Sequence, residues 1–332
     1  MATIGMTTTI PLEVVLAAGH RPLDLNNVFV SDPDAPGLVR EAERVGYPRT
    51  ACAWIKGIYA LLRRHRVDQV VMVTEGDCSQ THAMMETLRD EGLVLVPFAY
   101  PYDRDRERLR HELEKLLRHF GVTWEDAEEI RRELVPLRRK VAQLDAMTWQ
   151  QGTVTGWENH LYQVSCSDFQ GDPSLFGAQV EALLGVARER GARPWRLRVG
   201  FVGVPPVYTD LYSFLEEREV LVAYNEVQRQ FTMADSLDCD LLEQYARYTY
   251  PYDVFGRLAD IGREVKRRRL DGVIHYVQAF CFRQIQDQLI RRRVACPVLT
   301  LEGDSPGPLE ARNRLRLEAF LETLDSRRRV AG

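Results

Sequence analysis

Helical and strand-like spacings of apolar residues alternate along the first third of the chain. The helical spacings cover residues 12–18, 36–45, 53–65 and 79–90. The short apolar runs cover residues 23–25, 70–73 and 93–97. The run at 70–73 is unbroken and rich in Val, which is typical of a parallel strand buried on both faces. Residues 1–102 are therefore predicted to form one α/β unit.

The pattern changes between residues 103 and 192, which are charged and helical with almost no strand signal. One helical face contains Leu109, Leu113, Leu116, Leu117 and Phe120. After a capping box at Thr123 and Asp126, a second helix has a heptad-like stripe of Ala127, Ile130, Leu134, Leu137, Val141 and Leu144. This stripe predicts either packing onto its own domain or a coiled-coil or dimer face. A third helix is predicted at 178–190.

A second α/β pattern begins near Trp195. Strands are predicted at 197–202, 219–224, 272–277 and 298–301, and helices at 211–217, 254–269, 282–293 and 309–324. Strands that alternate with helices favour parallel sheets with crossover helices. The predicted fold class is α/β, with two Rossmann- or flavodoxin-like parallel-sheet domains, 1–102 and 193–332. A helical segment, 103–192, joins them and a cleft lies between them.

Composition and charge narrow the function classes. The chain has 332 residues, of which 45% are hydrophobic, and a net charge of −4, so no global field favours nucleic acid or an anionic membrane. No apolar run reaches the length of a bilayer span, and the N-terminus lacks the pattern of a signal peptide. We therefore expect a cytoplasmic protein whose six cysteines stay reduced.

Two segments of the chain repeat one layout around a cysteine. Asp68 begins an apolar run that ends ten residues later at Cys78, and Asp271 begins one that ends ten residues later at Cys281. A predicted helix follows each cysteine, and another predicted helix follows Cys52. The carboxyl edge of a parallel sheet is where α/β proteins bind ligands, and the helix dipole there favours a thiolate.

Three thiolates gathered in a cleft would suit an iron–sulfur cluster, with one iron left open to water or substrate. The alternative is that Cys52, Cys78 and Cys281 are small buried core residues, a common place for free cysteine. Cys166, Cys239 and Cys296 lack the repeated context, and Cys296 is expected in the core.

Weaker catalytic candidates surround these cysteines. Glu75 lies on the turn before Cys78, Gln278 holds the matching place before Cys281, and Lys56 lies one helical turn beyond Cys52. They could line a pocket or shuttle protons, or they could be turn, cap or solvated residues. Asp77 fits a cap better than a catalytic role. The chain has no GxxxxGK[ST] loop, so we expect it to bind no nucleotide.

Taken together, these motifs resemble the 2-hydroxyacyl-CoA dehydratase and benzoyl-CoA reductase family, which includes the double-cubane-cluster proteins. The similar segments are 10–23, 52–57, 68–78, 97, 246–251, 271–274, 280–281, 296–304 and 316–322. The resemblance implies α/β domains around a [4Fe–4S] cluster, or a double-cubane [8Fe–9S] cluster. It also implies that Cys52, Cys78 and Cys281 are the ligands.

The resemblance further implies a dimer, with itself or with a related subunit, and a separate ATP-hydrolysing iron–sulfur activator protein. In dehydratases of the family, a low-potential electron makes a ketyl radical from an acyl-CoA thioester and so allows water to be eliminated. The leading hypothesis is therefore the iron–sulfur subunit of a 2-hydroxyacyl-CoA dehydratase-like lyase.

Three alternatives stay open at this point. The first is an ATP-dependent reductase of the benzoyl-CoA reductase or double-cubane type, acting on an acyl-CoA or a small molecule. The second is a non-catalytic electron-transfer protein that carries a cluster. The third is a metal-free two-domain binding protein with core cysteines.

Overall fold

Two parallel sheets and a set of helices form the protein in a computed structural model that describes residues 1–65 and 67–331. The first sheet has the order β2-β1-β3-β4 and the second the order β6-β5-β7-β8, and all paired strands within them are parallel. The predicted α/β class with two Rossmann- or flavodoxin-like sheets is confirmed.

The first sheet is built from the N-terminal third of the chain. Its strands are β1 (Thr3–Met6), β2 (Arg21–Asp24), β3 (Gln69–Glu75) and β4 (Leu95–Ala99). One face packs on α4 (Ala53–Arg64) and α5 (Ser79–Asp90), through Ile58, Met72 and Leu88. The other face packs on α1 (Leu12–Ala17), α6 (Arg106–Phe120) and α7 (Trp124–Ala146). The sheet is thus the middle layer of three, which explains the unbroken apolar run at 70–73.

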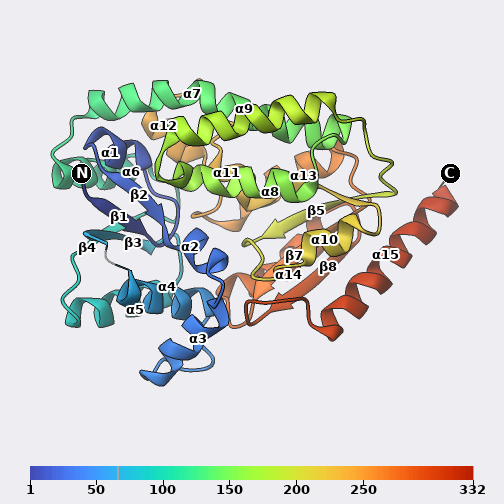
Figure 1. Ribbon diagram of the computed structural model, residues 1–332, viewed down its shortest axis with the longest axis horizontal. Helices are drawn as coiled ribbons and strands as arrows, with labels where there is room; N and C mark the ends of the chain where they lie inside the picture. Colours follow the sequence, from blue (N-terminus) through green and yellow to red (C-terminus); the bar gives the residue numbers. More distant parts are fainter. Residues whose placement is uncertain (66, 332) are drawn as a thin grey trace.

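The second sheet repeats this three-layer arrangement. Its strands are β5 (Leu197–Gly203), β6 (Val220–Asn225), β7 (Gly272–Gln278) and β8 (Val298–Gly303). One face is covered by α10 (Leu211–Glu216) and α15 (Ala311–Ala331), and the other by α13 (Val254–Arg267) and α14 (Asp287–Arg293). Figure 1 shows α15 extending from the body toward the C-terminus.

Helices between the sheets form the rest of the molecule. Figure 1 shows α7 and α9 (Pro173–Glu189) running alongside each other, with α8 (Gly156–Val164) between them and the second sheet. The apolar stripe of α7 is buried in the same core cluster as the first sheet, so this stripe packs onto its own chain. The domain boundaries at 102 and 192 stay predictions.

The core beside the first sheet also contains residues from far along the sequence. Val227, Phe231, Tyr245 and Tyr252 pack in the same apolar cluster as Ile4. They belong to or follow α11 (Glu226–Phe231) and α12 (Leu241–Arg247), two short helices that the apolar pattern did not indicate. The pattern also missed α2 (Leu25–Ser31), and α3 (Ala35–Arg44) begins one residue before the predicted start. Four short 3₁₀ or π elements complete the described part of the chain, at 147–151, 165–167, 169–171 and 282–286.

None of the helices in the described parts of the chain has both the length and the apolarity needed to cross a bilayer.

Candidate functional site

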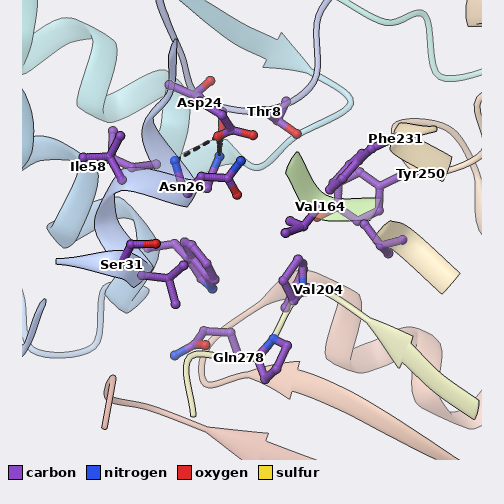
Figure 2. Close-up of a pocket in the computed structure, with 18 of the residues that line it drawn as sticks. Thr8, Asp24, Asn26, Ser31, Ile58, Val164, Val204, Phe231, Tyr250 and Gln278 are labelled. Atoms are coloured by element: carbon purple, nitrogen blue, oxygen red, sulfur yellow. Dashed lines mark hydrogen bonds between the residues drawn. The ribbon is translucent and has the colours of Figure 1, made fainter. Parts of the chain in front are cut away.

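A cavity of about 670 Å³ opens where the carboxyl ends of both sheets converge. Thr7 and Thr8 follow β1, Asp24 ends β2, Val204 follows β5 and Gln278 ends β7. Figure 2 shows Thr8, Asp24 and Asn26 on one side of the open space and Val204 and Gln278 on another. This is the edge at which open α/β sheets generally bind ligands.

All three cysteines of the predicted set line this cavity. Cys52 is the N-cap residue of α4, Cys78 is the N-cap of α5, and Cys281 is the N-cap of the 3₁₀ turn Phe282–Gln286. The helix predicted at 282–293 therefore starts as a 3₁₀ turn and becomes α-helical only at Asp287. Three segments that are distant in sequence thus bring thiols to one cavity wall.

The turns that carry two of these cysteines share an uncommon backbone conformation. Gly76, two residues before Cys78, has a φ of +96°, and Phe280, one residue before Cys281, has a φ of +59°. A left-handed conformation is unfavourable for a residue as bulky as phenylalanine, and such strain is frequent at functional sites. The repeat seen in the sequence thus corresponds to two sharp strand-to-helix turns at one edge.

Burial dominates the acidity of the three thiols. It raises the pKa of Cys52 to about 12, and the neighbouring sulfurs of Cys78 and Cys281 add to the rise. Burial also raises the pKa of Cys78 to about 11, with the Asp77 carboxylate contributing, and raises the pKa of Cys281. In the metal-free chain, loss of solvation therefore outweighs the stabilisation of thiolates that is expected at the helix starts, and the net pKa of each thiol is raised.

The surroundings of the sulfurs suit an iron–sulfur cluster. Backbone N–H groups of Trp54 and Ile55 hydrogen-bond Cys52, and that of Arg283 hydrogen-bonds Cys281, which lowers the pKa of each thiol. Such donors stabilise negative charge on cluster sulfurs. Among the described residues no three His, Cys, Asp or Glu side chains are close enough to hold a single ion. A cluster binds each cysteine through a different iron, so it accommodates more widely spaced thiols than one ion does.

Of the three catalytic candidates, Gln278 alone lines the cavity. Its Oε1 accepts a hydrogen bond from the Tyr276 hydroxyl at 3.1 Å, and its buried Nε2 has no partner among the described residues. Lys56 is buried in an ion pair with Glu43, at 2.7 Å between Nζ and Oε1. Glu75 accepts a hydrogen bond from the backbone N–H of Tyr102 at 3.0 Å. Lys56 and Glu75 are thus engaged away from the cavity wall.

Three carboxyl groups form part of the lining: Asp24 and Asp168 are buried, and Asp77 is half-buried. Asp77 accepts a hydrogen bond from the Thr81 hydroxyl at 2.8 Å, and burial raises its pKa to about 6. Burial also raises the pKa of Asp168 to about 7, with the nearby Asp24 carboxylate adding to the rise. Asp77 lies in the turn before Cys78, which is the N-cap residue of α5, so Asp77 is a turn residue and does not cap the helix. Its carboxyl holds its proton more tightly than a solvated one.

Sequence analysis missed the cavity wall that α8 supplies. Trp157, His160, Leu161 and Val164 all line the cavity, at the i, i+3, i+4, i+7 spacing of one helical face. His160 is buried, its Nδ1 lies 3.0 Å from the Gln228 amide nitrogen, and burial lowers its pKa to about 3. The signal that could have found it is this apolar stripe with one histidine inside it.

A family model described as 2-hydroxyglutaryl-CoA dehydratase, D-component, matches residues 7–324. The search of curated proteins gave no match. The matched range contains every strand of the two sheets except β1, and every cysteine of the predicted set.

Proposed function

The chain belongs to the 2-hydroxyglutaryl-CoA dehydratase D-component family, and from this premise we propose that it is the iron–sulfur subunit of a 2-hydroxyacyl-CoA dehydratase-like lyase. The observation that carries the proposal is the convergence of Cys52, Cys78 and Cys281 on one cavity. Three soft sulfur donors, each at the start of a helix or 3₁₀ turn, suit a [4Fe–4S] cluster with one open iron.

In this proposal Cys52, Cys78 and Cys281 hold the cluster through their Sγ atoms. When bound, such a cluster supplies single electrons at low potential, which is what forming a ketyl radical from an acyl-CoA thioester requires. The dehydratase description of the matched family favours elimination of water over reduction of the substrate. The double-cubane [8Fe–9S] cluster is the alternative cofactor for the same three ligands.

The chain's own side chains have separate tasks around the substrate. The apolar wall formed by Ile58, Leu161 and Val164 would exclude water from the acyl group. Gln278, whose Oε1 is fixed by Tyr276, would donate a hydrogen bond from Nε2 to a substrate oxygen. Lys56, which is ion-paired with Glu43, and Glu75 would have structural roles.

The proposal includes protein partners. Phe280, Phe282 and Ile285 are exposed large apolar residues directly beside Cys281, and an apolar patch of this kind suits a protein contact. We propose a related subunit or a second copy of the chain as the dimer partner, and an ATP-hydrolysing iron–sulfur activator as the electron donor, in the cytoplasm. No nucleotide site in this chain is part of the proposal.

Iron and acid-labile sulfide per chain, measured on protein purified without oxygen, test the cofactor. We expect about four irons per chain and a broad brown absorption band. Cys52→Ser, Cys78→Ser and Cys281→Ser should each lose most of the iron. Cys239→Ser is the matched control, because Cys239 lies outside the cavity lining. No iron after anaerobic reconstitution would leave the metal-free binding protein as the better hypothesis.

Turnover with activator, ATP and reductant then tests the reaction. An enoyl-CoA product formed without net consumption of electrons supports dehydration. Electron consumption in proportion to product supports the reductase alternative. If the absorption spectrum of the cluster does not change when acyl-CoA is added, the hypothesis of a non-catalytic electron-transfer protein is favoured.

A further inference from the structure

Arg283 joins the turns that carry two of the three cysteines. It lies two residues after Cys281, and its Nη2 donates hydrogen bonds to the backbone oxygen of Gly76 at 3.2 Å and to that of Tyr250 at 2.8 Å. Gly76 is two residues before Cys78. The guanidinium carbon also lies 4.3 Å from the centre of the Tyr250 ring. These contacts hold the guanidinium at the cavity wall, and Arg283 is 5% exposed.

The buried arginines of this protein are otherwise paired with carboxylates. Those pairs are Arg131 with Glu128, Arg138 with Glu13, Arg229 with Asp260, Arg257 with Glu226, and Arg268 with Asp145. Arg283 is the exception within residues 1–65 and 67–331. It makes no ion pair there, and its Nη1 is buried without a hydrogen-bond partner. An uncompensated buried charge is strongly unfavourable, so the surroundings of Arg283 call for an anion.

Asp77 does not supply that anion by direct contact. Its carboxyl accepts a hydrogen bond from the Thr81 hydroxyl, and Nη1 of Arg283 has no hydrogen-bond partner among the described residues. Arg283 lines the same cavity as the three cysteines, and its guanidinium contacts the backbone of Gly76, two residues before Cys78. An anionic group held by the three cysteines would therefore provide the counter-charge that Arg283 lacks.

We propose that Arg283 is a positioning residue that provides the counter-charge for an anionic cluster held by Cys52, Cys78 and Cys281. It also fixes the distance between the Cys78 and Cys281 turns. This inference rests on the proposed function, because it requires the cluster. Net charge and hydrogen bonds around a cluster set its reduction potential. A fixed cation in the wall of the same cavity therefore makes the cluster easier to reduce.

The test measures the midpoint potential of the anaerobically reconstituted full chain, together with iron per chain. Arg283→Gln removes the charge and should shift the potential to a more negative value. Arg283→Lys keeps the charge and should leave the potential near that of the wild type. Arg292→Gln, at an exposed position of α14, is the control for loss of one positive charge and should leave the potential unchanged.

Two outcomes overturn the inference while the proposed function stands. In the first, the wild type and Arg283→Gln bind the same iron at the same potential. In the second, Arg283→Lys shifts the potential as far as Arg283→Gln, which would mean that the two carbonyl contacts matter rather than the charge. If Arg283→Gln does not fold, as judged by circular dichroism, Arg283→Met replaces it as the uncharged variant, and an unchanged potential in Arg283→Met likewise overturns the inference. A wild type that binds no iron overturns both proposals.

Discussion

The backbone N–H of Asp24 donates a hydrogen bond to Oδ2 of Asp168 at 2.8 Å, so two buried carboxyl groups lie side by side in the cavity wall. Asp24 also caps α2 through the backbone N–H of Asn26, and Asp168 accepts a hydrogen bond from the backbone N–H of Gln170. The pair therefore connects the first sheet to the helical segment. It also couples the two titrations, since each carboxylate opposes ionisation of the other.

The stability of the protein should fall as the pH rises through neutrality because of this pair. The pKa of Asp168 is about 7 in the folded state against 3.8 when solvated, so folding retains a proton that the unfolded chain releases. The contribution is complete below pH 3.8 and is lost as the pH rises through 7. The free energy of unfolding in urea should fall between pH 4 and pH 8 in the wild type. In Asp168→Asn we expect this fall to be smaller by roughly 2 kcal/mol. Asp90→Asn, an exposed control, should follow the wild type.

His160 should have the opposite pH dependence. Burial lowers its pKa from 6.5 to about 3, so the folded state keeps the imidazole neutral while the unfolded chain takes up a proton. The resulting stability is present above pH 6.5 and is lost as the pH falls toward 3. Replacing His160 with Gln should reduce the loss of stability between pH 7 and pH 5 by about 2 kcal/mol. An NMR titration in which the His160 ring signals move between pH 7 and pH 5 would contradict this prediction.

Gly76 should not tolerate a side chain. Its φ is +96°, and an added Cβ would lie 2.8 Å from the Pro251 Cβ and 2.9 Å from the Tyr100 Cβ. We expect Gly76→Ala to lower the free energy of unfolding by about 3 kcal/mol, from backbone strain and steric overlap together. Gly92→Ala separates the two effects, since Gly92 has a φ of +84° with nothing within 4 Å of an added Cβ. It should cost only about 1 kcal/mol, and equal losses in the two variants would exclude a steric contribution.

The Arg138–Glu13 ion pair should be a major contact between α7 and α1. Nη2 of Arg138 lies 2.8 Å from Oε1 of Glu13, and both side chains are fully buried. Glu13→Gln would leave the guanidinium without its counter-charge, so a loss of about 3 kcal/mol in urea unfolding is expected. The exposed Arg132–Glu125 pair offers a matched comparison. Glu125→Gln should change stability by less than about 1 kcal/mol.

Sequence analysis located most strands and helices because their apolar residues repeat locally. The helix at 79–90 has the predicted limits, and β4 lies two residues later than the predicted run. β1 escaped detection because only Ile4 and Met6 are strongly apolar in its four residues. Its strand conformation depends on pairing with β2 and β3 on either side, which is a tertiary effect.

The cavity was only partly accessible to the same reasoning. Cys78 and Cys281 stood out because the same sequence pattern precedes both. Arg283 did not, since no local pattern separates a cavity-facing side chain from a core or surface one. His160 lies in an apolar stripe of α8, but that stripe alone does not show that the helix faces a cavity. Arg283 donates its hydrogen bonds to the backbone oxygens of Gly76 and Tyr250, which are distant in sequence. The sequence alone therefore could not show that its partners are carbonyl groups and not carboxylates.

The interleaved core has a consequence for synthesis on the ribosome. Val227, Phe231, Tyr245 and Tyr252 complete the apolar cluster beside the first sheet, although the last strand of that sheet ends at Ala99. A nascent chain of one hundred or so residues would therefore have every strand of the sheet but an unfinished core on one face. The N-terminal unit must wait until residues beyond 250 emerge, and the two halves of the protein mature together rather than in turn.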